Sequence, residues 1–423
     1  MPRELTDTAS ITWDSSTPSL AKANINPLYV WPAGKPLPFG SPIVYAGDSI
    51  TAMAFDGTSN SQYGFMTWAQ TFSRQIAYAG IYANAGISGN TSAQLWARYA
   101  TDVLARSPKV VCLMIGTNDV LTVGAGASTA AINLFASNLA SMIAANRSIG
   151  AVTILFKVLP IGSVGSPMSA DQLLTWVGIN GVIATRAAAD VVLIDAEPLV
   201  GLRDANHTVV TNCFKVDYIH PSVRGAFLIG GLVAKTIKSL VADGDYFTKQ
   251  IIPANTWNMA GVGPNYANGF ANVSLPGSIT QACTVVARMD GNGQTQNVTF
   301  TGPSCSYADR GGIFQNINLT GVFNIGDIIQ GVVEVSTTDL VGVGSVGMDI
   351  IDLSSGEEIS LISFDANSDI PKTSWSGILT TKQHVCTHNW ASTNFAIVVY
   401  VGATTALSGT LTIGRIALMK GLT

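Results

Sequence analysis

Four short segments of this sequence combine residue types that could carry out nucleophilic chemistry. Ser49 stands in a Gly-Asp-Ser-Ile segment, and Asn118 stands in a Gly-Thr-Asn-Asp segment. His220 lies three residues after Asp217. A serine hydroxyl is a weak nucleophile until an imidazole takes its proton, and a carboxylate can hold that imidazole in the accepting tautomer. Ser49, His220 and Asp217 are therefore a candidate nucleophile, general base and orienting acid.

The fourth segment, residues 84–92, is rich in glycine and could supply backbone donors. A glycine allows a close approach to its backbone N–H that a side chain would block, and Gly86 and Gly89 both qualify. The side-chain amide of Asn118 can donate to an oxygen that becomes negative during a reaction. Each segment alone is also compatible with an ordinary turn or helix cap. Together, and in this order, they indicate chemistry that passes through an oxyanion.

The intervening sequence predicts the elements that must position these groups. Short runs rich in β-branched residues, apolar on both faces, are typical of buried parallel strands; they occur at 43–46, 81–84, 110–115, 152–158 and 191–194. Segments with a helical period follow them, at 65–78, 92–106, 127–147, 169–189 and 222–242. The alternation predicts an α/β fold, a three-layer α/β/α sandwich with a five-stranded parallel sheet. Ligands bind at the carboxyl ends of such strands, where Ser49 and Asn118 would lie.

The two ends of the chain differ from this middle part. Residues 1–42 hold seven of the 17 prolines, which predicts an extended arm with little regular structure. Residues 43–245 form the predicted α/β domain, and a linker follows near residues 243–254. Residues 255–423 consist of period-2 segments separated by Gly, Asn and Asp turns. They predict an all-β jelly-roll sandwich.

The composition excludes several classes of protein. Charged residues make up 11% of the 423 residues, against about 25% in an average protein. A highly charged disordered chain is excluded, and the formal net charge of −4 argues against nucleic-acid and anionic-membrane partners. We expect no membrane span and no signal peptide. His384 and His388 have no third ligand in their segment, so neither a metal nor a cofactor is predicted.

The four segments resemble the four sequence blocks of the SGNH (GDSL-type) hydrolase family, over roughly residues 41–243. The resemblance implies a flavodoxin-like α/β fold with Ser49 as nucleophile, His220 as general base and Asp217 as its orienting partner. It also implies an oxyanion hole formed by the N–H of Ser49, the N–H of Gly89 and the amide of Asn118. The competing α/β-hydrolase fold is disfavoured because the chain has no G-x-S-x-G segment.

Some details of the resemblance remain open. Gly89 stands where the family has its serine-glycine pair, and Gly86 is the competing donor. Two positions depart from the usual pattern, Ile50 in place of Leu and Asn90 in place of a common Asp, and neither has a catalytic role in the family. The second histidine of this domain, His207, is not followed by a helix signal and is expected in a surface loop.

A serine esterase joined to a β-sandwich suggests a carboxylic ester substrate, most often an O-acetyl group on a polysaccharide. The strand pattern of the β domain resembles jelly-roll carbohydrate-binding modules, in which Trp257, Trp375 or Trp390 could stack on sugar rings, although a buried Trp is the alternative. One alternative is a lipase or thioesterase acting on short acyl chains. Another is a phage tail structural or receptor-binding protein, trimeric through its β domain, that uses the hydrolase domain as a glycan deacetylase or carries it inactive. We expect an extracellular or virion-associated protein, with a cytoplasmic one left open.

Overall fold

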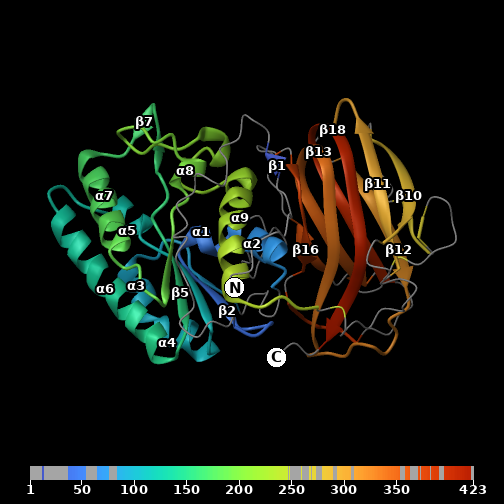
Figure 1. Ribbon diagram of the computed structural model, residues 1–423, viewed down its shortest axis with the longest axis horizontal. Coiled ribbons are helices and arrows are strands. Elements are labelled where there is room, and N and C mark those ends of the chain that lie inside the picture. Colours follow the sequence, from blue (N-terminus) through green and yellow to red (C-terminus); the bar gives the residue numbers. More distant parts are fainter. Residues whose placement is uncertain are drawn as a thin grey trace, which may run out of the picture. The chain divides into compact units, whose positions relative to one another are not determined.

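The computed structural model describes residues 12–13, 37–53, 64–75, 83–245, 247, 259, 266–267, 269–272, 279–288, 293–305, 309–352, 358–362, 370–371, 373–381, 383–389 and 395–420 (Figure 1). The chain divides into two compact units, one within Pro18–Gly244 and one within Asp245–Thr423 together with Met1–Thr17. Most of the predicted arm lies outside the described residues. The domain boundaries derived from the sequence stay predictions.

A five-stranded parallel sheet forms the centre of the α/β unit, as predicted. Its strands are β2 (Ile43–Gly47), β3 (Asn84–Gly86), β4 (Val110–Met114), β5 (Val152–Phe156) and β8 (Val191–Ile194). Their order across the sheet is β3-β2-β4-β5-β8, which is the flavodoxin-like order. The second strand begins at Asn84 rather than at 81, and residues 81–82 lie outside the described residues. Every residue of β2, β4 and β5 is buried, which explains their continuous apolar sequence.

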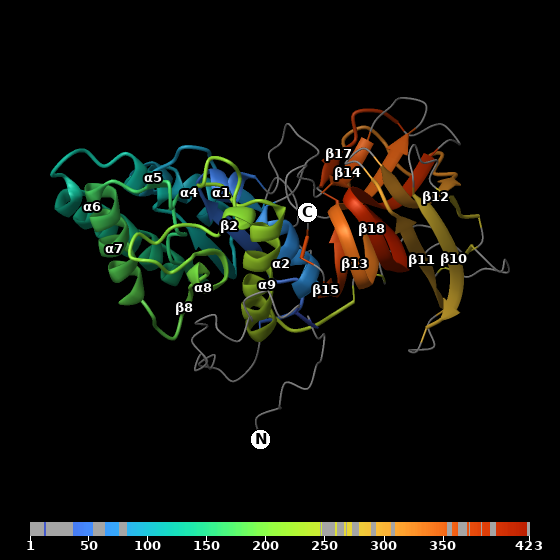
Figure 2. The same cartoon turned by 90° about the horizontal axis from the view of Figure 1, so that it is seen from above.

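Helices cover both faces of this sheet (Figures 1 and 2). One face carries α3 (Ser92–Ala97), α6 (Ser128–Ser148) and α7 (Ala170–Ala184), and the other carries α2 (Phe65–Ser73) and α9 (Val223–Leu240). The predicted helix 92–106 is instead three short pieces, because Arg98 leaves helical geometry with φ −109° and ψ 3°. These pieces are α3, α4 (Tyr99–Asp102) and the 3-10 turn η2 (Leu104–Arg106).

Several short elements lie in the loops and were not predicted. They are the helices α1 (Ser49–Ala52), α5 (Thr117–Leu121) and α8 (Glu197–Val200), the 3-10 turn η3 (Thr211–Cys213), and the hairpin strands β6 (Gly162–Ser163) and β7 (Ser166–Pro167). Each is shorter than six residues, too short to produce a readable period. Two of them, α1 and α5, contain residues of the candidate site.

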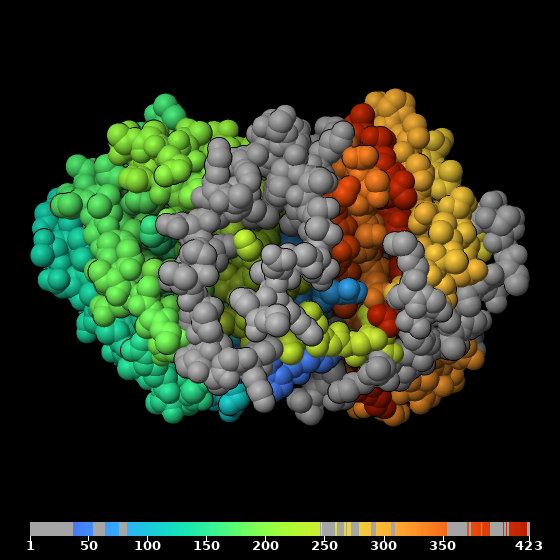
Figure 3. All heavy atoms as spheres, in the orientation of Figure 1, coloured from blue at the N-terminus to red at the C-terminus, as the bar shows by residue number. Residues whose placement is uncertain are grey.

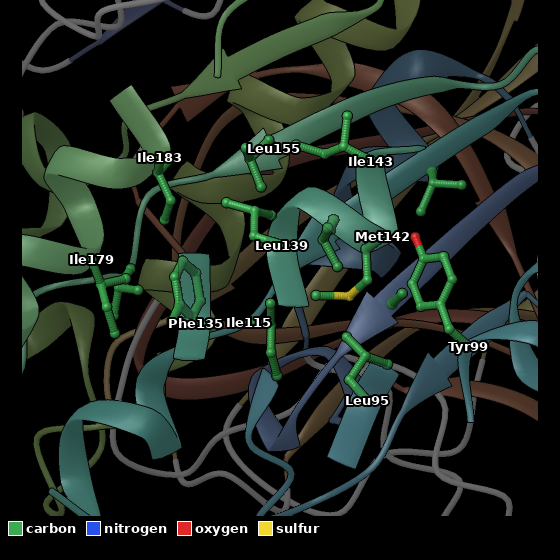
Figure 4. Packing of buried hydrophobic residues seen from close by; sticks show 14 of the residues in the cluster. Leu95, Tyr99, Ile115, Phe135, Leu139, Met142, Ile143, Leu155, Ile179 and Ile183 are labelled. Carbon is green, nitrogen blue, oxygen red and sulfur yellow. The ribbon is translucent and has the colours of Figure 1, made fainter. Parts of the chain in front are cut away.

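Two apolar layers hold the helices against the sheet. On one face, helix side chains are fully buried beside Leu155 of the sheet (Figure 4). They are Leu95 of α3, Leu139 and Met142 of α6, and Ile179 of α7.

On the other face, the ring of Phe227 from α9 lies 5.0 Å from both Trp68 and Phe72 of α2. Edge-to-face aromatic contacts of this kind add about 0.5–1.5 kcal/mol beyond the burial itself.

Within the described residues, one helix, α6, is long and apolar enough to cross a membrane by length and composition. Its side chains Phe135, Leu139, Met142 and Ile143 pack into the core of the α/β unit, and a core helix passes the same test. Figure 3 shows the teal and green atoms of α6 and α7 at the surface of this unit. The composition of α6 is therefore accounted for by its place in the fold.

The second unit is all-β, as predicted. Its strands are β9 (Ala271–Asn272), β10 (Thr280–Ala287), β11 (Gln294–Gly302), β12 (Arg310–Ile317), β13 (Ile328–Asp352), β14 (Glu358–Ile362), β15 (Thr373–Ser374), β16 (Ser376–Thr380), β17 (His384–Val385) and β18 (Phe395–Lys420). Strand β1 (Thr12–Trp13), from the predicted arm, pairs with β15. The long strands β13 and β18 pair along their whole length, with register shifts between Val333 and Ser345.

The two halves of the β13–β18 pair join different neighbours. Strand β11 pairs with the later half of β18 and β12 with the earlier half. A Cβ atom on Gly331, in the first half of β13, would lie 2.4 Å from Ile350 in the second half, so the halves face each other as layers. Trp375 is 5% exposed, in agreement with the buried alternative, and Trp257 and Trp390 lie outside the described residues. The jelly-roll connectivity and sugar binding stay predictions.

Candidate active site

The candidate site lies where the strand order of the α/β sheet reverses. The nucleophile candidate Ser49 follows β2, and Asn118 follows the adjacent strand β4. The chain continues from β2 to one side of the sheet and from β4 to the other. Such a switch point leaves a crevice outside the carboxyl ends of the two strands, which is where open α/β sheets bind ligands. The topology therefore brings two of the sequence segments together.

The short helix α1 holds Ser49 at its first position. Asp48 caps this helix, because its Oδ1 accepts the N–H of Ile50 at 3.0 Å. The side chain of Asn84, at the start of β3, donates to the carbonyl of Thr51 at 3.1 Å. The N–H of Ser49 belongs to the first turn, where backbone donors have no partner within the helix. Both ends of the nucleophile turn are thus fixed, and one donor beside the hydroxyl is left for a ligand.

The loop before α9 presents His220 to this serine. His220 Nε2 lies 2.8 Å from Ser49 Oγ, and His220 Nδ1 lies 2.8 Å from Asp217 Oδ2. The other oxygen of Asp217 accepts the backbone N–H groups of Ile219 and His220, each at 2.9 Å. Tyr218 adopts a left-handed conformation with φ 55°, which is costly for a residue with a side chain. The turn from Asp217 to His220 is therefore a strained but well-bonded support for the imidazole.

The hydrogen bonds define the electrostatics of the triad. Partial burial raises the pKa of Asp217, but the N–H donors of His220 and Ile219 outweigh it, and the net pKa lies below the usual value. An ionised Asp217 accepts a proton-bearing Nδ1, so Nε2 of His220 is the acceptor. Nε2 faces Ser49 Oγ. This arrangement can remove the serine proton as the oxygen attacks.

The glycine-rich loop and Asn118 lie side by side. The amide nitrogen of Asn118 donates to the backbone carbonyl of Asn90 at 3.0 Å, next to Gly89. Gly89 has φ +79°, and a Cβ atom there would meet nothing within 4 Å, so glycine is needed for its backbone angle rather than for space. The N–H of Gly86 is already donated to Asn84 Oδ1 at 2.8 Å. Of the two glycines, Gly89 is therefore the one that suits an oxyanion.

The carboxyl groups of Asp48 and Asp119 are buried beside the candidate site residues Ser49 and Asn118, and no role for them was predicted from the sequence. Burial raises the pKa of Asp48 to about 7, and the negative charge of Asp119 adds to the rise. Burial also raises the pKa of Asp119, although Ser92 donates to it from Nα at 2.8 Å and from Oγ at 2.6 Å. Asp119 thereby ties the start of α3 to the Asn118 turn. The signal that could have indicated these two residues is a charged side chain in the Gly-Asp-Ser-Ile segment and another in the Gly-Thr-Asn-Asp segment of a chain with few charges.

The second histidine of the α/β unit lies in a partly exposed loop, as expected, and it has side-chain partners that the sequence did not indicate. His207 Nδ1 is 2.5 Å from Glu197 Oε1, and the His207 ring stacks 4.2 Å from the ring of Trp176. The side chain of His207 is 30% exposed. Sequence reasoning missed this pair because Glu197 and Trp176 come from two other elements. Among the described residues, no group of three His, Cys, Asp or Glu side chains could hold a metal ion.

Comparisons with known proteins point to the same part of the chain. Residues 45–226 match the model of the GDSL-like Lipase/Acylhydrolase family. A GDSL-like lipase from Bacteroides thetaiotaomicron is 22% identical, with a TM-score of 0.37, over 47% of this chain and 88% of its own. An acetylxylan esterase mutant from Geobacillus stearothermophilus is 21% identical, with a TM-score of 0.37, over 48% of this chain and 96% of its own.

An uncharacterized lipoprotein from Bacillus subtilis is 37% identical over 78 residues, which are 18% of this chain. The chain spans 32% of the length of that relative. The family match begins within β2, two residues after its start, and ends inside α9, so it includes Ser49, Asn118, Asp217 and His220. Residues 45–226 of the α/β unit are therefore similar to the GDSL-like lipase/acylhydrolase family.

Proposed function

We propose that the protein is a serine esterase that hydrolyses carboxylic esters through Ser49, His220 and Asp217. The observation that carries the proposal is the continuous hydrogen-bonded series from Ser49 Oγ to His220 to Asp217, with 2.8 Å at each step. The family match over residues 45–226 supports the same reaction class.

In the proposed reaction, Ser49 Oγ attacks the ester carbonyl while His220 Nε2 takes the hydroxyl proton. The negative oxygen of the tetrahedral intermediate would accept the N–H groups of Ser49 and Gly89 and the amide of Asn118. His220 then gives its proton to the departing alcohol, which leaves an acyl group on Ser49. Water, activated by the same imidazole, releases the acid and restores the serine.

We further propose that the ester is an O-acetyl group on a polysaccharide. The low content of charged residues, 11%, suits an uncharged ligand, and a separate all-β unit offers a surface for a long glycan. A phage tail protein that removes acetyl groups from a host glycan would have this combination, as would an extracellular esterase.

A substrate panel tests both levels of the proposal. Initial rates on p-nitrophenyl acetate, butyrate and octanoate are measured beside acetate release from acetylated xylan and an acetylated capsule, with Ser49→Ala as control. We expect turnover of the acetate, little of the octanoate, and acetate release from one glycan. Faster hydrolysis of the octanoate would favour a lipase instead. Equal rates for wild type and Ser49→Ala would overturn the esterase proposal.

A further inference from the structure

Arg98 connects two segments that supply oxyanion donors. Its Nε donates to Asn90 Oδ1 at 2.8 Å, and its Nη2 donates to the carbonyl of Gly47 at 3.2 Å. Asn90 follows Gly89, and Gly47 ends β2 just before the Asp48–Ser49 turn. One guanidinium group therefore bonds to the backbone before the nucleophile and to the residue after the glycine donor.

The position of Arg98 follows from helix geometry. Asn90 precedes the N-cap of α3 and Arg98 is its C-cap, so eight residues, or about two turns, separate them on one side of the helix. The third nitrogen of the guanidinium, Nη1, bonds to Asp102 at 2.8 Å. Only 16% of the Arg98 side chain is exposed. All three nitrogens have acceptors, and the planar group is held in one orientation.

The carbonyl of Asn90 and its side chain have separate partners. The carbonyl accepts the amide of Asn118 at 3.0 Å, and the side chain accepts Arg98. Removing the Asn90 side chain would break its bond to Arg98 and leave the Asn118 contact in place. The loop at Gly89 is thus fixed from both sides by contacts that can be separated by mutation.

We propose that Arg98 and the side chain of Asn90 are positioning residues that hold the Gly89 N–H and the Ser49 N–H at the separation an oxyanion requires. The inference rests on the proposed esterase function. Oxyanion donors stabilise the intermediate when they lie about 2.7–3.1 Å from the oxygen, so a small displacement of either loop weakens both contacts. The two donors come from segments forty residues apart, and Arg98 bonds to a residue beside each of them, Asn90 after Gly89 and Gly47 before the Asp48–Ser49 turn.

The test uses the full chain and compares Arg98→Met, Arg98→Lys, Asn90→Ala and Asn90→Asp. Arg147→Met is the matched control, because Arg147 also bonds a carboxylate, that of Asp190, through two nitrogens at the far end of α6. On p-nitrophenyl acetate we expect Arg98→Met and Asn90→Ala to lower kcat about 10–100-fold with KM within twofold. Asn90→Asp retains the acceptor oxygen and should recover most of the loss. Arg147→Met should match the wild type.

Two further measurements separate positioning from general stability. The double variant Arg98→Met/Asn90→Ala should lose no more activity than the worse single variant, because both changes remove the same Arg98–Asn90 hydrogen bond. Labelling of Ser49 by a fluorophosphonate, followed by mass spectrometry, should slow in parallel with kcat. In that probe reaction His220 Nε2 takes the Ser49 proton, Ser49 Oγ bonds to phosphorus, fluoride leaves, and the phosphoryl oxygen occupies the oxyanion position.

The outcomes are distinct. An active wild type with equally active Arg98→Met and Asn90→Ala overturns this inference and leaves the esterase proposal standing. Additive losses in the double variant, or a lower melting temperature that tracks the lost activity, would assign Arg98 a structural role only and also overturn it. If Arg98→Met does not fold, Asn90→Ala and Arg98→Lys decide. A wild type that neither hydrolyses esters nor reacts with the probe overturns both proposals.

Discussion

Two histidine–carboxylate pairs lie in loops of the α/β unit, and they differ in what surrounds them. In one, His220 Nδ1 faces Asp217 and Nε2 faces Ser49 Oγ, each at 2.8 Å. In the other, His207 Nδ1 faces Glu197 at 2.5 Å, and the ring stacks on Trp176. The histidine side chains are similarly exposed, 27% for His220 and 30% for His207.

The difference shows that a histidine held by a carboxylate is not in itself a catalytic site. His220 has a hydroxyl at its second nitrogen and, beside that hydroxyl, donors that suit an oxyanion. The face of His207 covers an aromatic ring instead, and no described residue hydrogen-bonds its Nε2. We therefore propose that the first pair is reactive and that the second has a structural role. The predictions below test that division.

The largest expected effect comes from replacing each histidine with asparagine. His220→Asn removes the group that takes the Ser49 proton and should lower kcat/KM by at least ~10⁴-fold. His207→Asn should stay within threefold of the wild type, because its ring does not contact the triad. Steady-state rates on p-nitrophenyl acetate check both. Comparable losses in the two variants would contradict the division.

The next effect concerns the donors that only the His220 site possesses. Asn118→Ala should lower kcat by about 10²–10³-fold, the usual result of removing one oxyanion donor. KM should change little, because the interaction strengthens only as the oxygen becomes negative. A rise in KM at constant kcat would make Asn118 a substrate-binding residue instead.

How much the sequence could predict depends on whether the signal was local. The five strands could be predicted because each is a short continuous apolar run. The Asp217–His220 pair could be predicted because a spacing of three residues places both side chains on one turn. Arg98, which bonds Gly47 across the sheet edge, had no local signal beyond being a charged side chain in a charge-poor chain. The partners of His207 come from α7 and α8, and such pairs appear only after folding.

The motif residues divide in the same way. The family resemblance favours Gly89 over Gly86 as the oxyanion donor, and the structure adds a local reason, because the Gly86 N–H already donates to the side chain of Asn84 two residues earlier. Asn90 stands where the family commonly has Asp, and its residue type alone does not reveal that Arg98 bonds to its side chain. Local patterns predicted the candidate reacting groups, whereas side-chain supports such as Arg98 became visible only in the fold.

A third effect concerns the buried carboxyl groups of Asp48 and Asp119, which lie next to Ser49 and Asn118 in the chain. The pKa of Asp48 is raised to about 7 by burial and by the charge of Asp119, whereas an unfolded Asp has a pKa of about 3.9. The folded protein therefore holds this proton between those values. The contribution of Asp48 to stability is fully present below about pH 4 and is lost as the pH rises through about 7.

Asp48→Asn removes this titration while it keeps an oxygen for the Ile50 N–H. Relative to the variant, the wild type should lose up to ~4 kcal/mol of unfolding free energy between pH 4 and pH 8. Urea unfolding at several pH values measures the difference. Parallel stability profiles for the two proteins would show that folding does not raise the pKa of Asp48.

The smallest effect concerns the free energy of unfolding of the same two variants. Here we expect His207→Asn, not His220→Asn, to have the larger effect. His207→Asn breaks a partly buried hydrogen bond to Glu197 and a ring contact, so it should lower the free energy of unfolding by about 1–2 kcal/mol. His220→Asn should change it by less than about 0.5 kcal/mol, because Asp217 keeps its two backbone donors. Urea unfolding at one pH compares the two variants. If His220→Asn proved the more destabilising, the hydrogen bonds of the imidazole would be stabilising its loop. The strained conformation of Tyr218 would then be a consequence of the contacts with Ser49 and Asp217, not a device that positions His220.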